Sequence, residues 1–222
     1  MKNKDWKQHD IYRDTTNFVN AEYPYRWDVI NHVIKSAGYT TYLEIGLRRG
    51  QNFLKIEIDQ KESVDPRPMN GFIQPTHVMT SDEFFKNCPV DKKWDCIFID
   101  GLHEKSQVER DIHNAFNHLN EGGIVFTHDV NVLEKSMTKQ STCGDAWETF
   151  VKIRYTEPEL VAYCVPFDYL GMIERRSHEN EFLVLNPTDF LPENLKFEWM
   201  AENRIAVLNV ITEQQFNERW PL

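Results

Sequence analysis

The sequence predicts an α/β fold in which a doubly wound, mostly parallel sheet is covered by helices on both faces. Short apolar runs alternate with helix-like segments from YRWDVINHVIKSAG to Asp129, an order typical of parallel sheets with crossover helices. A glycine turn follows the first apolar run, in YLEIGLRRG. Acidic residues follow later runs, in IFID and FTHD, and doubly wound sheets bind ligands at such strand ends.

The first predicted helix lies in YRWDVINHVIKSAG, where apolar residues recur at helical spacing and Gly38 provides a stop. TTYLEIG follows as a short apolar strand. The next stretch, QNFLKIEID, alternates like a strand. We nevertheless predict a short helix there, because a doubly wound fold requires one between neighbouring parallel strands.

SVDP and THVMT are predicted as the next two strands, and SDEFFKN as a helix that begins after Ser81. WDCIFIDG is the clearest strand of the chain. EKSQVERDIHNAFNHL is the clearest helix, because its apolar residues form one stripe. GIVFTHD then reads as another buried strand.

The C-terminal third is less regular. DAWETFVKIR is predicted as a helix, and EFLVLN as a short strand. LVAYCVP and GMIERR are predicted to form an antiparallel hairpin, with FDYL in its turn. The aromatic-rich tail, NLKFEWMAENRIAVLNVITEQQFNERW, reads as helical cover for the sheet.

Composition narrows the function classes. The chain has 222 residues and a formal net charge of −10, and it lacks the basic block that nucleic-acid binding favours. Its apolar runs are too short to span a membrane, and the polar start MKNKDWKQHD does not resemble a secretory signal. No CxxC pair occurs among the four cysteines. We therefore expect a cytoplasmic protein that binds neither nucleic acid nor membranes.

The glycine turn has the pattern E-x-G-x-x-x-G, formed by Glu44, Gly46 and Gly50. Such a turn lets backbone approach a ligand closely, although an ordinary glycine turn would look the same. It lacks the GxGxxG spacing of dinucleotide-binding folds. Asp65 follows at the end of the next strand, where a carboxylate can accept both hydroxyls of a ribose. The alternative is a turn aspartate before Pro66.

The turn resembles the first motif of class I S-adenosylmethionine-dependent methyltransferases, especially the catechol O-methyltransferase-like branch. Many members of the superfamily have a middle glycine where Arg48 stands here. The IDG-x-H turn, the helix with V-x-x-D, and the strand from GG to HD together resemble the methyltransferase domain 24 subfamily, which includes macrocin-type sugar O-methyltransferases. The resemblance covers about residues 40–130, with a fainter likeness through GDAWETFVKIR and the tail.

This resemblance implies a Rossmann-like fold that binds S-adenosylmethionine. The implied cofactor-binding residues are Glu44, Gly46, Leu47, Gly50, Asp65, Thr80, Ser81, Asp82 and Asp100. Among them, Thr80 to Asp82 match the loop beside the adenine, although a plain helix cap would explain these residues as well. As one domain, residues 1–222 would divide into an arm (1–20), a cofactor-binding core (21–155) and a C-terminal cover (156–222).

Methyl transfer to an alcohol or phenol requires a base, or a metal that lowers the pKa of the hydroxyl. The resemblance implies a divalent cation held by Asp100, His128 and Asp129, and it makes His103, His128 and Asp129 the catalytic candidates. Carboxylates suit Mg²⁺, whereas a histidine ligand favours Mn²⁺. Alternatively, Asp100 contacts the cofactor amine, His128 is a core histidine and His103 caps the next helix. Asp111 on that helix is a candidate support for the site.

The leading hypothesis is a methyltransferase that uses S-adenosylmethionine and acts on an oxygen of a small-molecule or glycan acceptor. A homodimer is one candidate assembly. One alternative is a catalytically inactive domain that retains S-adenosylmethionine binding. Another is a nicotinamide-dependent oxidoreductase, which the missing GxGxxG spacing disfavours.

Overall fold

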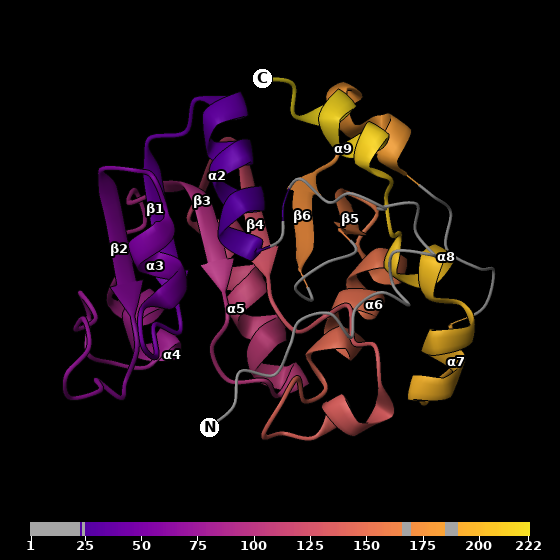
Figure 1. Ribbon diagram of the computed structural model, residues 1–222, viewed down its shortest axis with the longest axis horizontal. Helices are drawn as coiled ribbons and strands as arrows, with labels where there is room; N and C mark the ends of the chain where they lie inside the picture. The colour runs from indigo at the N-terminus through magenta and orange to yellow at the C-terminus, as the bar shows by residue number, and fades with distance from the viewer. Residues whose placement is uncertain (1–22, 24, 166–169, 185–190) are drawn as a thin grey trace.

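The computed structural model describes residues 23, 25–165, 170–184 and 191–222. Within these ranges lies a six-stranded sheet of order β2-β1-β3-β4-β6-β5 (Figure 1). Its strands are β1 (Thr41–Ile45), β2 (Gln60–Val64), β3 (Trp94–Ile99), β4 (Leu119–Thr127), β5 (Leu160–Cys164) and β6 (Gly171–Arg175). β6 is antiparallel to β4 and β5, whereas β1 to β4 pair in parallel. The predicted fold class, including the antiparallel hairpin, is confirmed.

Helices cover both faces of the sheet. One face carries α2 (Arg26–Ala37), α3 (Gln51–Lys55) and α9 (Glu213–Arg219), with the 3₁₀ helix η3 (His178–Leu183). The other carries α4 (Ser81–Asn87), α5 (Lys105–Asn117), α6 (Ala146–Thr156), α7 (Phe197–Glu202) and α8 (Arg204–Leu208). A short 3₁₀ helix, η2 (Lys135–Thr138), lies in the connection from β4 to α6. None of the helices in the described part of the chain is both long and apolar enough to cross a membrane.

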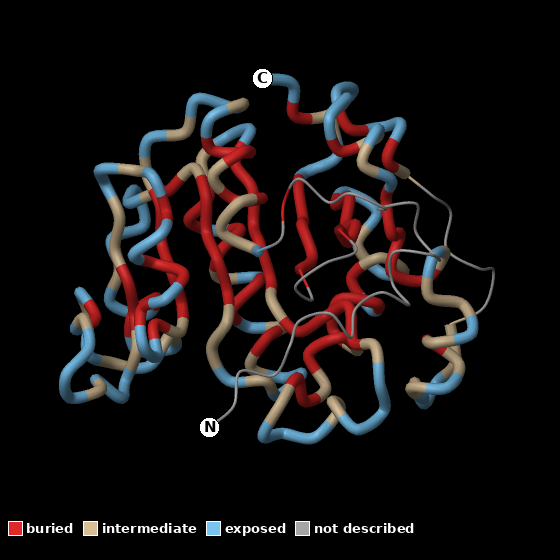
Figure 2. Tube along the Cα trace, in the orientation of Figure 1, coloured by how far each residue is buried: buried red, intermediate tan, exposed pale blue. Residues whose placement is uncertain are grey.

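The central strand β3 shows why its last four residues, CIFI, form an uninterrupted apolar run. Cys96 and Phe98 belong to the hydrophobic cluster that includes α2 and α3. Ile97 and Ile99 belong to the opposite cluster, which includes α4, α5 and α6. Because successive side chains of a strand point to opposite faces, a strand covered on both sides buries every side chain. Figure 2 shows the resulting band of buried residues along the central strands.

Two predicted strands are wrong. THVMT forms only an isolated bridge, between His77 and Val64. Two hydroxyls occupy the neighbouring positions: the Thr76 amide donates to Ser63 Oγ, and the Ser63 amide donates to Thr76 Oγ1, each at 3.1 Å. These bonds use backbone donors that a longer ladder would need. The described part of EFLVLN begins inside η3, where Ser177 and Asn180 form a capping box, so it starts as a helical turn. The last two residues of this segment lie outside the described residues.

The other predicted elements correspond to observed ones. The first helix ends at Gly38 as expected, QNFLK forms the short helix α3, and the tail forms α7, α8 and α9. The predicted arm, residues 1–20, lies outside the described residues, as do residues 166–169, which include most of FDYL.

Candidate active site

Three parallel strands end side by side at one edge of the sheet. The backbone continues their hydrogen bonding one residue further: the Gly46 amide donates to Val64 O, the Asp100 amide to Ile45 O and the His128 amide to Ile99 O, at 2.8, 2.8 and 2.9 Å respectively. The loops after β1, β3 and β4 therefore start in register. This alignment brings the glycine turn, Asp100 and His128 to the same edge, where doubly wound folds bind ligands.

Gly46 allows the turn after β1 to lie directly against the turn after β3. Its φ of 93° is a left-handed conformation, and a Cβ at this position would lie 2.0 Å from the Asp100 carbonyl oxygen. Glycine alone adopts this conformation readily and leaves this space open. Gly50 then precedes the first residue of α3. Gly46 is thus required by the contact between the two turns.

Asp65 fastens the glycine turn to the end of β2. Its Oδ2 accepts a hydrogen bond from the Arg48 amide and its Oδ1 accepts one from the Arg67 amide, both at 2.8 Å. Asp65 therefore does stabilise a turn, as the alternative interpretation expected. Each carboxylate oxygen can accept more than one hydrogen bond, so the predicted ribose contact remains compatible with these bonds and stays a prediction.

Thr80 caps α4, and Ser81 is the first residue of the helix, so the predicted cap at Ser81 is wrong by one residue. The segment from Thr80 to Asp82 also contacts α5. Thr80 Oγ1 accepts from the Glu83 amide as a capping box. Gln107 Nε2 donates to Ser81 Oγ at 3.2 Å, to Asp82 Oδ1 at 3.1 Å and to Asp111 Oδ1 at 3.0 Å. Burial raises the pKa of Asp111 to about 6. This network ties the predicted adenine loop to the helix that follows the Asp100 turn.

A small cavity of about 120 Å³ lies between the glycine turn, the start of α2 and Asp100. Its lining residues are Arg26, Glu44, Gly46, Leu47, Arg48, Arg49, Gln51, Asn52 and Asp100. Glu44 is buried there and accepts hydrogen bonds from the Tyr42 hydroxyl at 2.6 Å and from Asn52 Nδ2 at 2.7 Å. Burial raises the pKa of Glu44 to about 7, although these hydrogen bonds oppose the shift.

The raised pKa of Glu44 makes stability depend on pH. The folded carboxyl holds its proton up to about pH 7, whereas its ordinary pKa is 4.5. Its contribution to the free energy of unfolding is therefore fully present below pH 4.5 and is lost as the pH rises towards 7. We expect Glu44→Gln to reduce the fall in unfolding free energy across this interval by roughly 3 kcal/mol.

Urea denaturation at several pH values between 4.5 and 7 would measure this effect. Glu57→Gln is the matched control, because Glu57 is exposed. An identical pH profile in Glu44→Gln and the parent chain would contradict the assigned shift.

Four side chains from the loops after β3 and β4 converge beside this cavity. His103 Nε2 lies 3.3 Å from Asp100 Oδ1 and 3.1 Å from Asp129 Oδ2. His128 Nδ1 lies 3.5 Å from Asp100 Oδ1 and 3.2 Å from Asp129 Oδ1. Asp129 adopts a φ of 62°, a left-handed conformation that aspartate tolerates better than most residues. The predicted catalytic residues therefore do meet at one point.

The two carboxylates and the two imidazoles stabilise one another's charges. Burial alone would raise the pKa of Asp100, but the charge of His128 and hydrogen bonds from both histidines hold it well below its ordinary value. Burial alone would lower the pKa of His128, but Asp100 and Asp129 raise it well above 6.5. For His103, burial also lowers the pKa, yet the same two carboxylates raise it overall.

His103 is oriented by the loop that follows β4. Its Nδ1 is hydrogen-bonded to the carbonyl oxygen of Thr142, so Nδ1 carries the proton and Nε2 points to the two carboxylates. The Asp145 amide also donates to the His103 carbonyl at 3.1 Å. One candidate ligand atom from each of Asp100, His103 and Asp129 lies within 4.8 Å of the others. The resemblance had implied His128 as the histidine ligand of the cation and His103 as a catalytic base. In the structure, it is His103 that joins the two carboxylates as a candidate ligand.

Sequence reasoning missed three contributors to the site. Arg26 lies at the start of α2, and its Nη2 is 3.9 Å from Asp100 Oδ2. Asn52 bonds to Glu44, and Thr142 orients His103. Asn52 could have been found as a buried polar residue just inside the helix after the glycine turn. The other two are far from the motifs in sequence, and only the fold brings them to the site.

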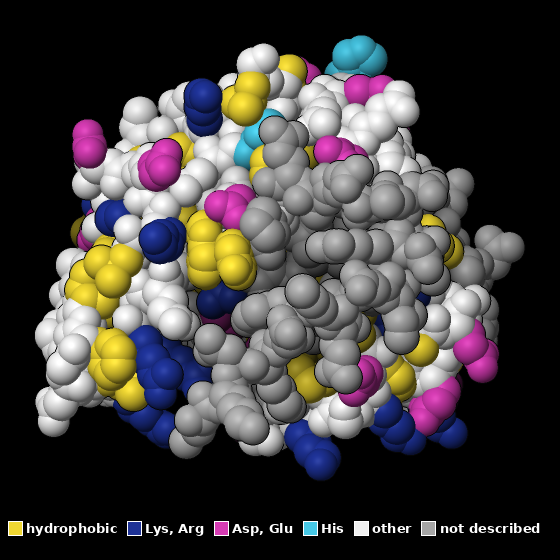
Figure 3. Space-filling model, in the orientation of Figure 1, with side chains coloured by type: hydrophobic (Ala, Val, Ile, Leu, Met, Phe, Trp, Pro, Cys, Tyr) yellow, Lys and Arg dark blue, Asp and Glu magenta, His cyan; other side chains and the backbone are white. Residues whose placement is uncertain are grey.

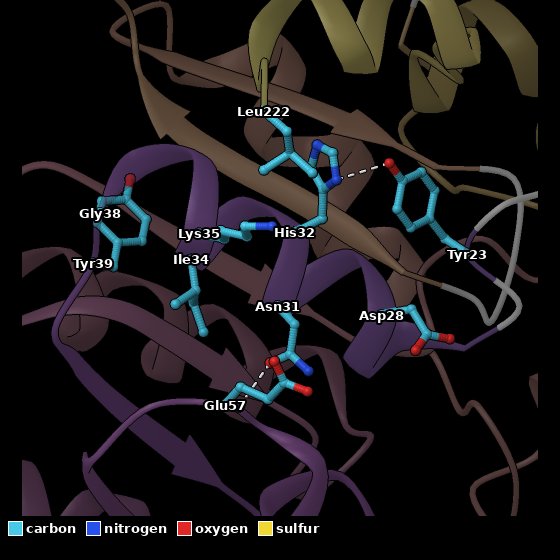
Figure 4. Close-up of a pocket in the computed structure, with 10 residues that line it drawn as sticks. All are labelled: Tyr23, Asp28, Asn31, His32, Ile34, Lys35, Gly38, Tyr39, Glu57 and Leu222. Carbon is cyan, nitrogen blue, oxygen red and sulfur yellow. Dashed lines mark hydrogen bonds between the residues drawn. The ribbon is translucent and has the colours of Figure 1, made fainter.

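Larger grooves elsewhere contain none of the predicted site residues. One of about 590 Å³ runs along α2 to the C-terminal residues (Figure 4). His32 lies in it, with Nδ1 2.8 Å from the Tyr23 hydroxyl and Nε2 2.7 Å from the Trp220 carbonyl. Both ring nitrogens thus fasten the end of the chain to α2. A second groove, of about 680 Å³, lies between α6 and α7.

Comparison with known proteins agrees with the sequence motifs. Residues 40–130 match the family model described as a methyltransferase domain, which confirms the predicted resemblance. This segment runs from β1 to the cluster after β4 and contains every predicted site residue. No curated protein matches the sequence of the chain.

Solved structures show the same fold at low sequence identity. A protein from Klebsiella pneumoniae, provisionally assigned as an O-methyltransferase, is 14% identical and has a TM-score of 0.52, covering 75% of this chain and 86% of its own. The O-methyltransferase TomG of Streptomyces achromogenes is 13% identical with a TM-score of 0.51, covering 67% and 79%. A Staphylococcus aureus protein, provisionally assigned as a caffeoyl-CoA O-methyltransferase, is 17% identical with a TM-score of 0.50, covering 76% and 91%.

Proposed function

We propose that the chain is an S-adenosylmethionine-dependent methyltransferase that methylates an oxygen of a small-molecule or glycan acceptor. The observation that carries the proposal is the shared edge of the sheet, where the glycine turn and the Asp–His cluster meet within the matched methyltransferase segment. The structure of TomG, which has the same fold, was determined in complex with S-adenosylmethionine.

The residues around the small cavity fit the cofactor. The turn at Gly46 exposes backbone beside Asp100, and Asp65 follows β2, the position whose acid binds a ribose in doubly wound folds. Asn52 Oδ1 is buried and has no hydrogen-bond partner among the described residues, so a ligand donor would satisfy it. When bound, S-adenosylmethionine supplies an electrophilic methyl group. The protein's part is to hold the acceptor oxygen in line with that group.

The cluster beside the cavity fits a divalent cation. Asp100, His103 and Asp129 offer two carboxylates and one imidazole, a set compatible with Mg²⁺ or Mn²⁺. The bond from His103 Nδ1 to a backbone carbonyl is the usual support of a metal-binding histidine. A cation held there would lower the pKa of an acceptor hydroxyl. His128, the other predicted ligand, faces both carboxylates and keeps their charges compensated.

Without a metal, His103 would act as the general base. Its Nε2 faces the point where Asp100 and Asp129 converge, so an acceptor hydroxyl bound there could transfer its proton to the imidazole. An inactive cofactor-binding domain is the other alternative. The clustering of two carboxylates and two histidines at one point favours catalysis over it, since a binding scaffold would not need this costly arrangement.

Titration calorimetry tests the proposed cofactor. We expect S-adenosylhomocysteine to bind and NAD to give no signal, because the turn has the E-x-G-x-x-x-G spacing. The same preparation, supplied with S-adenosylmethionine and a panel of sugars and phenols, would identify the acceptor. Binding of NAD in the absence of S-adenosylhomocysteine binding would overturn the proposal in favour of an oxidoreductase.

Asp65 allows a second test of the cofactor site. Asp65→Ala should weaken S-adenosylhomocysteine binding by about 2–3 kcal/mol, the order expected for hydrogen bonds to a charged group. The melting temperature reports separately on the loss of the bonds to the Arg48 and Arg67 amides. An unchanged dissociation constant would leave Asp65 with only its role in the turn.

A further inference from the structure

Arg26 is held at the mouth of the cofactor cavity by contacts on several sides. It is the first residue of α2, and 19% of its side chain is exposed. Its guanidinium carbon lies 6.0 Å from the ring centres of both Trp27 and Phe98. Such cation–π contacts attract the guanidinium towards the two rings. Arg26 is thus pre-positioned at the cavity.

The cavity has an asymmetric distribution of charge. Arg26 supplies a guanidinium, whereas Glu44 and Asp100 supply carboxyl groups. Arg26 Nη2 lies 3.9 Å from Asp100 Oδ2, so the positive and negative groups of the cavity are close neighbours. The buried Asn52 Oδ1 adds an acceptor without a partner among the described residues. In Figure 3, basic and acidic side chains lie together in a hollow below the start of α2.

A zwitterion would be complementary in charge to both parts of this cavity. An ammonium group can donate to Asn52 Oδ1 and to the carboxyl oxygens, and a carboxylate can accept two parallel bonds from a guanidinium. The volume of about 120 Å³ suits a head group rather than a nucleoside. The amino-acid end of S-adenosylmethionine has an ammonium group and a carboxylate bonded to the same α-carbon.

We propose that Arg26 binds the α-carboxylate of the amino-acid end of the cofactor and thereby makes the site selective for ligands that carry this group. The inference rests on the proposed function, because it assumes that S-adenosylmethionine is the ligand. It assigns a specificity-determining role to a residue outside the glycine turn and the Asp–His cluster. Arg26 selects the ligand through its head group and takes no part in proton transfer.

Equilibrium binding of two ligands tests the role of Arg26. S-adenosylmethionine and its decarboxylated form differ only in the α-carboxylate, so their affinity ratio isolates this contact. By calorimetry without acceptor, we expect the parent chain to prefer S-adenosylmethionine by about 10–100-fold, the range for hydrogen bonds between charged groups. Arg26→Gln should reduce that preference to about threefold or less, because its amide cannot replace a charged bidentate donor.

Two further variants make the result decisive. Arg26→Lys keeps the charge but loses the planar fork, so it should retain an intermediate preference, and it serves as the test if Arg26→Gln does not fold. Arg176→Gln is the matched control, because Arg176 also faces an acid, Glu181 at 3.3 Å, away from the cavity. The control should keep the full preference.

Failure of the inference and failure of the proposed function give different results. If Arg26→Gln weakens the binding of both ligands equally, or of neither, Arg26 does not bind the carboxylate. The inference is then overturned, while the proposal that S-adenosylmethionine is the cofactor is retained. If the parent chain binds neither ligand, the proposed function fails and the inference fails with it. Loss of preference in the Arg176→Gln control would also overturn the assignment.

Discussion

Replacing Asp129 with alanine should reduce methyl transfer by about 10²–10⁴-fold, the range associated with losing a group that positions or removes the acceptor proton. Asp129 contacts both histidines of the cluster, at 3.1 and 3.2 Å. Binding of S-adenosylhomocysteine should be nearly unchanged, because the residues of the cofactor cavity lie on the earlier loops and Asp129 does not line it. Turnover and calorimetry on the same preparation would separate the two effects.

Adding a chelator distinguishes catalysis that depends on a bound cation from catalysis by His103 as the general base. If a cation lies among Asp100, His103 and Asp129, chelation should abolish turnover, and Mg²⁺ or Mn²⁺ should restore it. If His103 acts alone as the base, chelation should have no effect. Activity should then fall as the pH drops through the pKa of His103, which its carboxylate neighbours raise above 6.5.

Asp91→Ala is the control for Asp129→Ala. Asp91 is exposed and precedes β3, at the opposite edge of the sheet from the cluster, so its replacement should leave turnover intact. Full activity in Asp129→Ala and in variants of both His103 and His128 would reject the whole cluster as a catalytic site.

Gly46→Ala should destabilise the fold by about 3–5 kcal/mol and abolish cofactor binding, because two costs combine. Its φ of 93° is unfavourable for any residue with a Cβ, and that Cβ would lie 2.0 Å from the Asp100 carbonyl oxygen. The carbonyl belongs to the backbone and cannot rotate away as a side chain can. The turns after β1 and β3 would have to separate, and the cavity between them would change shape.

Gly71→Ala separates the two costs. Gly71 has a similar φ of 80°, but a Cβ there would meet nothing within 4 Å. It should therefore show only the conformational cost, about 1–2 kcal/mol. Urea denaturation of both variants would measure the difference. Equal destabilisation would show that the close approach of the two turns contributes nothing.

Most of the strands and helices could be predicted because local sequence is sufficient for them. The continuous apolar run in β3 reflects burial on both faces, and the apolar stripe of α5 reflects burial on one. THVMT has the composition of a strand, yet its pairing stops at one bridge. The cause is the exchange of bonds between Ser63 and Thr76, which local composition does not reveal.

The sequence by itself determined the order of elements, the glycine turn and the acids and histidines at the strand ends, because these features depend on residue type and spacing along the chain. Tertiary structure alone decided which groups share a point in space. It brought Arg26 from the start of α2 to Asp100 and placed the Thr142 carbonyl on His103 Nδ1. Side-chain direction within a cluster depends on loop conformation, such as the left-handed backbone of Asp129, and on contacts between segments far apart in sequence.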